Sequence, residues 1–320
     1  MTALGIMIEG QEGLTWERWN RLADATERLG FDSLWRSDHL SSVMGVPERE
    51  TLAVFPSLTA VALRTNRIDF GPLVPPTTFR HPVHLAMDAV ALDHLSGGRA
   101  WIGVGAGWNV HEHEAFGFNL LPLKERMDRM EEALQVMTLL WTGETVSFAG
   151  KHFQLNDAQS RPTPLRNGKV RLVIGGAGEK RTLRMVAEYA DDWNATTMPP
   201  DAYAAKVEVL KRHCADVGRD PATIRQSIMT AFIVGRDRAE IRRRAAKIQE
   251  IIPATAGSDP EDLAAGMKAR GSLVGTPDEI VEQVLQRQTM GVALIMLQLH
   301  DHDDIEALEL LASDVLPHIQ

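Results

Sequence analysis

An Asp-His pair and two glycine-rich segments contain the residue types that are best suited to acid–base and cofactor chemistry. The pair is Asp38-His39. Histidine gives or takes a proton near neutral pH, and an adjacent carboxylate can raise its pKa and fix its tautomer. We therefore expect His39 to be a catalytic acid or base, with Asp38 as its orienting partner or as a contact of a bound ring. A helix cap or a turn is the alternative explanation of such a pair.

The first glycine-rich segment is Gly103-Val104-Gly105-Ala106-Gly107, and Trp108 and Asn109 follow it. Because glycine has no side chain, Gly105 and Gly107 would let a planar ligand approach the backbone closely. Trp108 and Asn109 would then contribute an apolar wall and an amide. Tight packing of a strand against a helix also needs glycine and is the competing explanation.

The second glycine-rich segment is Gly175-Gly176-Ala177-Gly178, which precedes a predicted helix. Free amides at a helix N-terminus, together with the helix dipole, bind phosphate. Lys180 and Arg181 would add positive charge. The spacing differs from that of a P-loop. We expect all four residues of this segment to contact a cofactor phosphate, with a plain tight turn as the alternative.

The remaining polar candidates carry a weaker signal. Glu9 and Gln298 lie at the ends of the first and last predicted strands and are expected to contact a substrate. The run His111-Glu112-His113-Glu114 contains metal-ligand residue types. However, residues two apart diverge on a helix, and the H-E-x-x-H spacing is absent. We therefore predict no metal site.

Short apolar segments alternate with amphipathic helices along the whole chain. Eight segments have the pattern of buried strands: Leu4–Ile8, Ser33–Arg36, Ile68–Val74, Trp101–Gly105, Val170–Ile174, Trp193–Ala195, Ile224–Val234 and Leu294–Leu299. The clearest helix is Leu123–Trp141, and a hairpin is predicted over 146–154. Eight β/α units favour a closed (β/α)8 TIM barrel of the α/β class over an open doubly wound sheet. The open sheet would need a third glycine where Trp108 stands.

A barrel places its active site at the C-terminal ends of its strands. The Asp-His pair and both glycine-rich segments directly follow predicted strands, so we expect them to gather around one site. We predict a single domain over 1–320 with an insertion at about 251–270. The loops 40–50, 117–121 and 251–270 are expected to shape the substrate pocket.

The composition argues against several other classes of protein. The formal net charge is −9 and the pI is about 5.7, which disfavours binding to nucleic acid. The one cysteine, Cys214, excludes an intramolecular disulfide and a cysteine-based metal site. The first residues lack a basic signal-peptide region, and no apolar stretch is long enough to span a membrane. We expect a cytoplasmic enzyme that acts on a small molecule.

Several motifs, taken together, resemble those of the luciferase-like oxidoreductases, from the first strand to about Leu299. The matching segments are Phe31–Trp35 with Ser37-Asp38-His39, Arg80-His81-Pro82, Leu92–Arg99, Gly103–Asn109, Leu123–Arg126, Gly175–Leu183, Asp191–Asn194 and Gly275–Glu279. The resemblance implies a barrel that holds FMN or F420 over the strand ends. The ring would lie near the second to fourth strands and the phosphate near 175–178. A bulge with a non-prolyl cis peptide is implied at Leu73-Val74-Pro75, so Leu73 and Val74 would contact the cofactor.

The Ser37-Asp38-His39 motif and the opening segment 7–13 are similar to the branch assigned to coenzyme F420. The resemblance therefore implies an F420-dependent oxidoreductase of this class, with His39 beside the reacting ring. The alternative is an FMN-dependent monooxygenase that receives reduced flavin from a separate reductase and uses oxygen. A barrel that carries or senses a flavin without catalysis is the third interpretation. Trp108 replaces a catalytic glutamate of the family's sugar-phosphate dehydrogenases, which argues against that substrate.

The family commonly forms homodimers, so the resemblance also implies a homodimer here. The apolar stripe of the predicted helix 123–141 would then face either the barrel or a partner chain.

Overall fold

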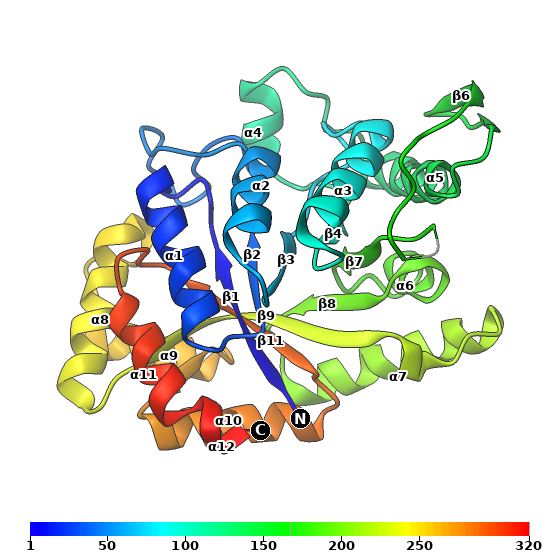
Figure 1. Cartoon of the computed structure of the whole chain (residues 1–320). Coiled ribbons are helices and arrows are strands. Elements are labelled where there is room, and N and C mark those ends of the chain that lie inside the picture. Colours follow the sequence, from blue (N-terminus) through cyan, green and yellow to red (C-terminus); the bar gives the residue numbers. More distant parts are fainter. Residues whose placement is uncertain (167, 320) are drawn as a thin grey trace.

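The eight predicted strands form a parallel barrel in the computed structural model, which describes residues 1–166 and 168–319. The strands are β1 (Ala3–Ile8), β2 (Ser33–Arg36), β3 (Asp69–Pro72), β4 (Trp101–Val104), β7 (Arg171–Gly175), β8 (Asp192–Thr196), β9 (Arg225–Val234) and β11 (Leu294–Leu299). They pair in the order β3-β2-β1-β11-β9-β8-β7-β4. Parallel bridges Phe70–Ala100 and Pro76–Gly105 link the two ends of this order and close the barrel (Figure 1). The predicted fold class is confirmed.

Helices surround the barrel and connect successive strands (Figure 1). They are α1 (Trp16–Arg28), α2 (Val54–Arg64), α3 (Pro82–Ser96), α4 (Val110–Ala115), α5 (Leu123–Trp141), α6 (Thr182–Tyr189), α7 (Pro200–Asp216), α8 (Arg238–Ile251), α9 (Pro260–Ala269), α10 (Pro277–Thr289), α11 (Ile305–Asp314) and α12 (Leu316–Ile319). Short 3-10 turns lie at Pro221–Thr223 and Pro253–Thr255. The apolar stripe of α5 is buried within this single chain from Met127 to Trp141, while Leu123 at its start is exposed.

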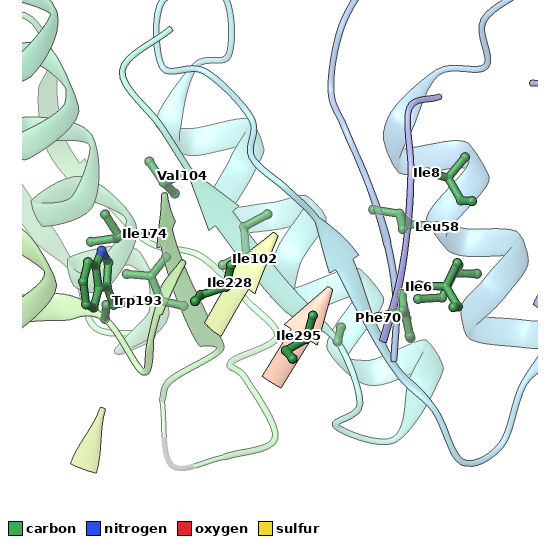
Figure 2. Close-up of a cluster of buried hydrophobic side chains, with 14 of the residues drawn as sticks. Ile6, Ile8, Leu58, Phe70, Ile102, Val104, Ile174, Trp193, Ile228 and Ile295 are labelled. Atoms are coloured by element: carbon green, nitrogen blue, oxygen red, sulfur yellow. The ribbon is translucent and has the colours of Figure 1, made fainter. Parts of the chain in front are cut away.

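Side chains alternate between two apolar layers because successive residues of a strand point to opposite faces. Ile6 and Ile8 of β1 point outward and join the layer between barrel and helices, part of which is drawn in Figure 2. Met7 points inward and packs in the barrel interior with Trp35 and Trp101. The interior is thus a packed core, and the open space lies above it at the strand ends.

The first residues of five strands form a polar cluster at the N-terminal end of the barrel. Asp69 pairs with both terminal nitrogens of Arg171 at 2.6 and 2.7 Å. Asp192, fully buried, pairs with Arg225. Both guanidinium groups lie over the Trp101 ring, at 4.4 and 4.1 Å from its centroid. These contacts close the end of the barrel that is opposite the predicted active site.

The predicted insertion belongs to a small folded region that packs around the end of β9. β9 is long, and its end, Phe232–Val234, pairs with the additional strand β10 (Leu273–Gly275) after its pairing with β11 has ended. α8, α9 and β10 enclose a separate apolar cluster that includes Ile248 and Met267. The stretch 251–270 was predicted as a loop insertion and is instead largely helical. The predicted hairpin is present as β5 (Val146–Ala149) and β6 (Gln154–Ala158).

Candidate active site

A cavity of about 510 Å³ opens at the C-terminal ends of the strands. Most of the residues that the sequence analysis selected line it: Glu9, Asp38, His39, Leu73, Val74, Gly105, Gly107, Trp108, Asn109, Gly175 and Gly176. Other lining residues are Met7, Ser37, Val43, Pro76, Ala106, Glu112, His113, Asn194, Thr196 and Met229. Ala177, Gly178 and Gln298 are not among the lining residues. The substrate loops 117–121 and 251–270 contribute none of the described lining residues either, whereas Val43 comes from the loop 40–50.

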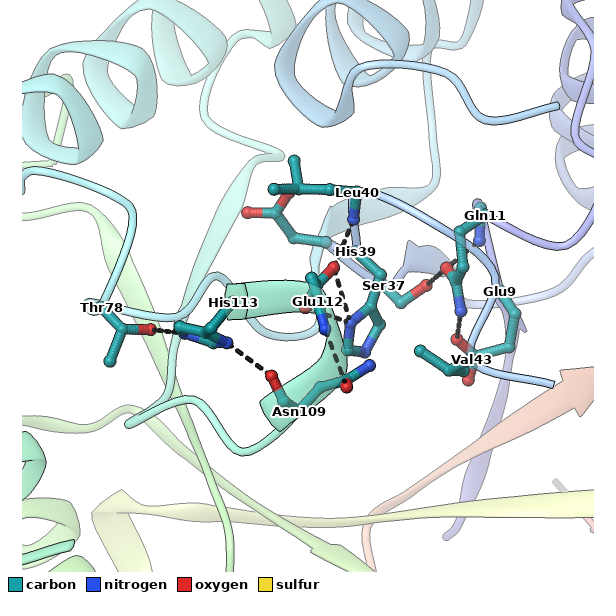
Figure 3. A network of polar contacts seen from close by, with 12 residues as sticks. Glu9, Gln11, Ser37, His39, Leu40, Val43, Thr78, Asn109, Glu112 and His113 are labelled. Carbon is teal, nitrogen blue, oxygen red and sulfur yellow. Dashed lines mark hydrogen bonds and ion pairs between the residues drawn. The ribbon is translucent and has the colours of Figure 1, made fainter. Parts of the chain in front are cut away.

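His39 pairs with Glu112, which lies in the first turn of α4 (Figure 3). The Nδ1 atom of His39 is 3.1 and 3.3 Å from the two carboxylate oxygens of Glu112. The backbone amide of Leu40 also donates to Glu112. The Glu112 side chain is 1% exposed and the His39 side chain 16%. The carboxylate therefore fixes Nδ1 as the inward-facing donor and leaves Nε2 as the ring nitrogen that can exchange a proton with a ligand.

The two partners shift each other's pKa toward the charged pair. Burial disfavours a charged imidazole, but the hydrogen bond to Glu112 and the charges of Glu112, Glu9 and Asp38 together outweigh it and raise the pKa of His39. Burial also works against a charged Glu112, yet His39 and the Leu40 amide lower the pKa of that carboxyl. The site therefore favours a protonated His39 beside an ionised Glu112.

Asp38 does not orient His39, contrary to expectation. Its carboxylate is held by Arg80, whose Nη2 and Nε atoms donate to it at 2.7 and 2.9 Å. Arg80 follows the turn at 77–79 and lies two residues before α3, so this bidentate pair links the segment after β2 to the segment after β3. The contact with a bound ring stays a prediction for Asp38, while the orienting role belongs to Glu112.

Trp108 forms one wall of the cavity and is 64% exposed. Its ring meets the His39 ring edge-to-face with 5.7 Å between centroids. Asn109 caps α4 by accepting from the Glu112 amide at 3.2 Å. His113 fixes the other side of α4, with Nδ1 2.6 Å from the Asn109 carbonyl and Nε2 2.7 Å from the Thr78 hydroxyl (Figure 3). The short helix α4 thereby positions the His39 partner.

The glycines of the first segment mainly make room for another side chain. The Leu73–Val74 peptide is cis and non-prolyl, as the family resemblance implied. A Cβ on Gly103 or Gly105 would lie 2.7 or 2.6 Å from the Val74 side chain. Packing therefore explains Gly103 and Gly105 better than close approach of a ligand does. Gly107 has a φ of +76°, which itself requires glycine.

The loop 175–181 offers backbone donors, though not all of those predicted. The Gly176 amide donates to the Asn194 carbonyl at 3.0 Å, so it is engaged within the barrel. In the described chain, the amides of residues 177–181 donate to no other group. Arg181 is paired with Asp128 and Glu131 of α5, so it does not add free positive charge. Residues 177–181 therefore remain the candidate anion donors.

Glu9 belongs to a second polar network on the β1 side of the cavity (Figure 3). Its carboxylate accepts from Gln11 Nε2 at 2.8 Å and from Gln298 Nε2 at 2.6 Å. Gln11 in turn accepts from the Ser37 hydroxyl at 2.6 Å. Gln298 thus supports Glu9 and does not itself line the cavity.

Sequence reasoning missed Glu112, Arg80, Gln11 and Ser37 as parts of the site. Glu112 was considered only as a metal ligand. Its position three residues after the capping Asn109 places it in the first turn of a helix at a strand end, and this signal was available. No group of three or more His, Cys, Asp or Glu suited to a metal occurs among the described residues. No helix in the described ranges is both long and apolar enough to cross a membrane.

Comparison with known proteins places the chain in a family. A model described as luciferase-like monooxygenase matches residues 3–294. An F420-dependent hydroxymycolic acid dehydrogenase of Mycobacterium tuberculosis is 27% identical, over 99% of this chain and 88% of the relative. An FMNH(2)-dependent dimethylsulfone monooxygenase of Pseudomonas putida is 26% identical, over 89% and 84%.

Two solved structures share the fold at low sequence identity. The coenzyme F420 dependent tetrahydromethanopterin reductase of Methanopyrus kandleri has a TM-score of 0.80 at 20% identity, covering 100% of this chain and 99% of that one. A monooxygenase of Streptomyces bottropensis has a TM-score of 0.84 at 21% identity, with both chains fully covered. The family match over nearly the whole chain, on a closed barrel with this strand-end cavity, shows that the protein belongs to the luciferase-like monooxygenase family and is an oxidoreductase.

Proposed function

We propose that this chain is an F420-dependent oxidoreductase that moves a hydride between the deazaflavin and a small organic substrate. The observation that carries the proposal is the hydrogen-bonded His39–Glu112 pair, which places an imidazole with a raised pKa at the wall of an otherwise largely apolar cavity. Reduction of a carbonyl or related group needs a proton as well as a hydride, and a positioned imidazolium supplies the proton. The similarity of its motifs to the F420-assigned branch supports the choice of cofactor.

The residues present fit a bound deazaflavin or flavin. The cavity volume lies within the range of roughly 300–1,000 Å³ that is usual for small-molecule sites. Leu73, Val74 and Gly175 form an apolar floor, and Trp108 forms an apolar wall beside His39. The unengaged amides of 177–181, next to the start of α6, fit a phosphate. When bound, F420 would supply the hydride-carrying C5 atom.

Within this site each side chain would have a separate role. His39 would donate a proton from Nε2 to the substrate, while Glu112 holds Nδ1 and stabilises the charged ring. Asp38, neutralised by Arg80, would contact the cofactor ring without adding net charge. Trp108 would exclude water from the reacting face. No lysine or arginine is among the described lining residues, so a phosphate group of a substrate would meet neither of these side chains there.

An FMN-dependent monooxygenase, served by a separate flavin reductase, is the rival function. It is favoured by the nearly equal similarity to the FMNH(2)-dependent relative. Calorimetric titration of the purified protein with F420 and with FMN separates the two. We expect tight binding of F420 and oxidation of reduced F420 by members of a panel of ketones, enones and imines. Tight binding of FMN with no response to F420 would contradict the proposal.

We also propose that the protein is a homodimer, as its family resemblance implies. Since the α5 stripe is buried within the monomer from Met127 onward, the dimer contact would have to involve other surface residues. Sedimentation at micromolar concentration tests this proposal, and a single monomeric species would refute it.

A further inference from the structure

Glu9 occupies an unusual electrostatic position at the edge of the cavity. It follows β1 directly, lines the cavity and is 8% exposed. Both of its oxygens accept a hydrogen bond, but from the neutral amide groups of Gln11 and Gln298. Asp38 is paired with Arg80 and Glu112 with His39, so Glu9 is the described lining carboxylate that has no cationic hydrogen-bond partner.

The hydrogen bonds behind Glu9 run in one direction. The Gly10 amide can only donate, and it donates to the Ser37 hydroxyl at 3.1 Å. The Ser37 hydroxyl donates a hydrogen bond to Gln11 Oε1 at 2.6 Å, which orients the Gln11 amide nitrogen toward Glu9. The series of hydrogen bonds from Gly10 through Ser37 and Gln11 thus ends at the Glu9 carboxylate, which accepts. This order presents Glu9 to the cavity as a carboxylate whose remaining lone pairs accept further donors.

A buried cation, Arg36, lies behind this series of hydrogen bonds and balances the charge of Glu9. Arg36 is fully buried, and it donates to neutral groups only: the Ser57 hydroxyl and the Leu52 and Ser37 carbonyls. Burial lowers the pKa of Arg36 to about 10, while the charges of Asp38 and Glu9 act in the opposite sense. Gly10 makes room for this guanidinium, since a Cβ there would lie 2.1 Å from Arg36 Nη2. The cation supports Glu9 from behind yet cannot reach a ligand in the cavity.

We propose that Glu9 is a specificity-determining residue that accepts a hydrogen bond from a hydroxyl or amino group of the substrate. The substrate class is then neutral or cationic hydroxy and amino compounds. Carboxylates and phosphates are disfavoured, because they would face Glu9 with no lysine or arginine among the described lining residues, and the imidazole of His39 is already paired with Glu112. This inference rests on the proposed function for the reaction, but the selectivity itself concerns only binding.

Three probes that differ in one group on the same ring test the proposal: benzylamine, benzyl alcohol and benzoate. Their affinities are measured by calorimetry, with and without F420, for the parent, Glu9→Gln, Glu9→Asp and Glu306→Gln. Glu306 is an exposed residue of α11 outside the cavity, so its variant controls for a change of one charge. Circular dichroism and thermal unfolding establish that each variant is folded.

We expect the parent to bind benzylamine and benzyl alcohol roughly ten- to a hundredfold more tightly than benzoate, the range of one charge-assisted hydrogen bond. Glu9→Gln should abolish this preference, whereas Glu9→Asp and Glu306→Gln should retain it. No preference in the parent, or an unchanged preference in Glu9→Gln, would overturn the proposal. Loss of F420 affinity in Glu9→Gln would also overturn it, because Glu9 would then contact the cofactor. If the parent binds no F420, the proposed function fails, while the titrations without F420 still decide the role of Glu9.

Discussion

The two ends of the barrel use the same kinds of charged residue in different ways. At the N-terminal end, Asp69 and Asp192 each pair with an arginine, and the guanidinium groups of Arg171 and Arg225 stack on Trp101. Arginine stays charged at any physiological pH. The arginines of this end therefore keep their charge, while burial raises the pKa of Asp192 against the opposing effect of Arg225 and Ser227. The contacts of this end contribute stability.

At the C-terminal end, the partner of Glu112 is an imidazole, and that of Glu9 is a pair of neutral amides. The imidazole of His39 changes its charge near neutral pH, and Glu9 keeps acceptor capacity toward the cavity. The two ends therefore differ less in the number of their carboxylates than in the groups that pair with them. Arginine partners make one end structural, whereas imidazole and amide partners make the other end reactive. Substitutions at the C-terminal end should alter the reaction, and substitutions at the N-terminal end should alter the stability of the fold.

The largest effect is expected for His39→Ala. Its turnover of the best substrate from the ketone, enone and imine panel should fall roughly 10²–10⁴-fold, the usual contribution of a general acid. F420 affinity should change little, since the cofactor would be held by the loop 177–181 and the apolar floor. Steady-state kinetics and calorimetry measure the two quantities. Normal turnover at saturating cofactor would make His39 a packing residue.

Asp192→Ala should show the opposite behaviour. Removing the buried partner of Arg225 leaves an uncompensated charge and should lower the free energy of unfolding by about 3 kcal/mol. Denaturant unfolding measures this loss. F420 affinity of the folded protein should stay at the parental value. Asp24→Ala, which removes an exposed partner of Arg64, is the control and should leave stability nearly unchanged. Equal stability of the Asp192 variant and the control would contradict the structural role of the N-terminal end of the barrel.

A smaller effect is expected at the phosphate loop. Ala177→Asp places a carboxylate among the unengaged amides and should weaken F420 binding by roughly tenfold or more, because like charges repel at this helix start. Ala177→Asn has nearly the same size without the charge and should bind F420 much more tightly than the aspartate variant. Equal affinities of the two variants would place the phosphate elsewhere on the rim.

Much of the fold was predictable from the sequence because the barrel strands are short, apolar and regularly spaced. β2 and α5 have the predicted bounds, and the predicted site segments lie at the strand ends. The strand β10 and the helices α4 and α9 were missed. β10 has three residues and gains its pairing only because β9 extends beyond β11, a long-range feature that no local pattern reveals.

The site was less predictable, since the partners within it are set by loop geometry. Asp38 adjoins His39 in sequence, yet its side chain turns to Arg80, and Glu112 approaches from a helix 73 positions away. Glycines alone could not show whether a ligand or the Val74 side chain occupies the space beside Gly105. Periodicity identifies elements, whereas the pairing of charges depends on how separate loops meet.

The most direct test of the account is the titration of His39 itself, which needs no substrate. Two-dimensional NMR of the imidazole signals, with the His39 resonance identified by its loss in His39→Asn, gives the pKa in the parent, in Glu112→Gln and in Glu114→Gln. Glu114 is an exposed residue of the same helix and serves as the charge control. Because Glu112 raises the pKa against burial, the parent should titrate above the ordinary value of 6.5, and Glu112→Gln should titrate at lower pH. Glu114→Gln should resemble the parent. A parental pKa at or below the ordinary value, or one that Glu112→Gln leaves unmoved, would contradict the claim that this pair holds the proton for catalysis.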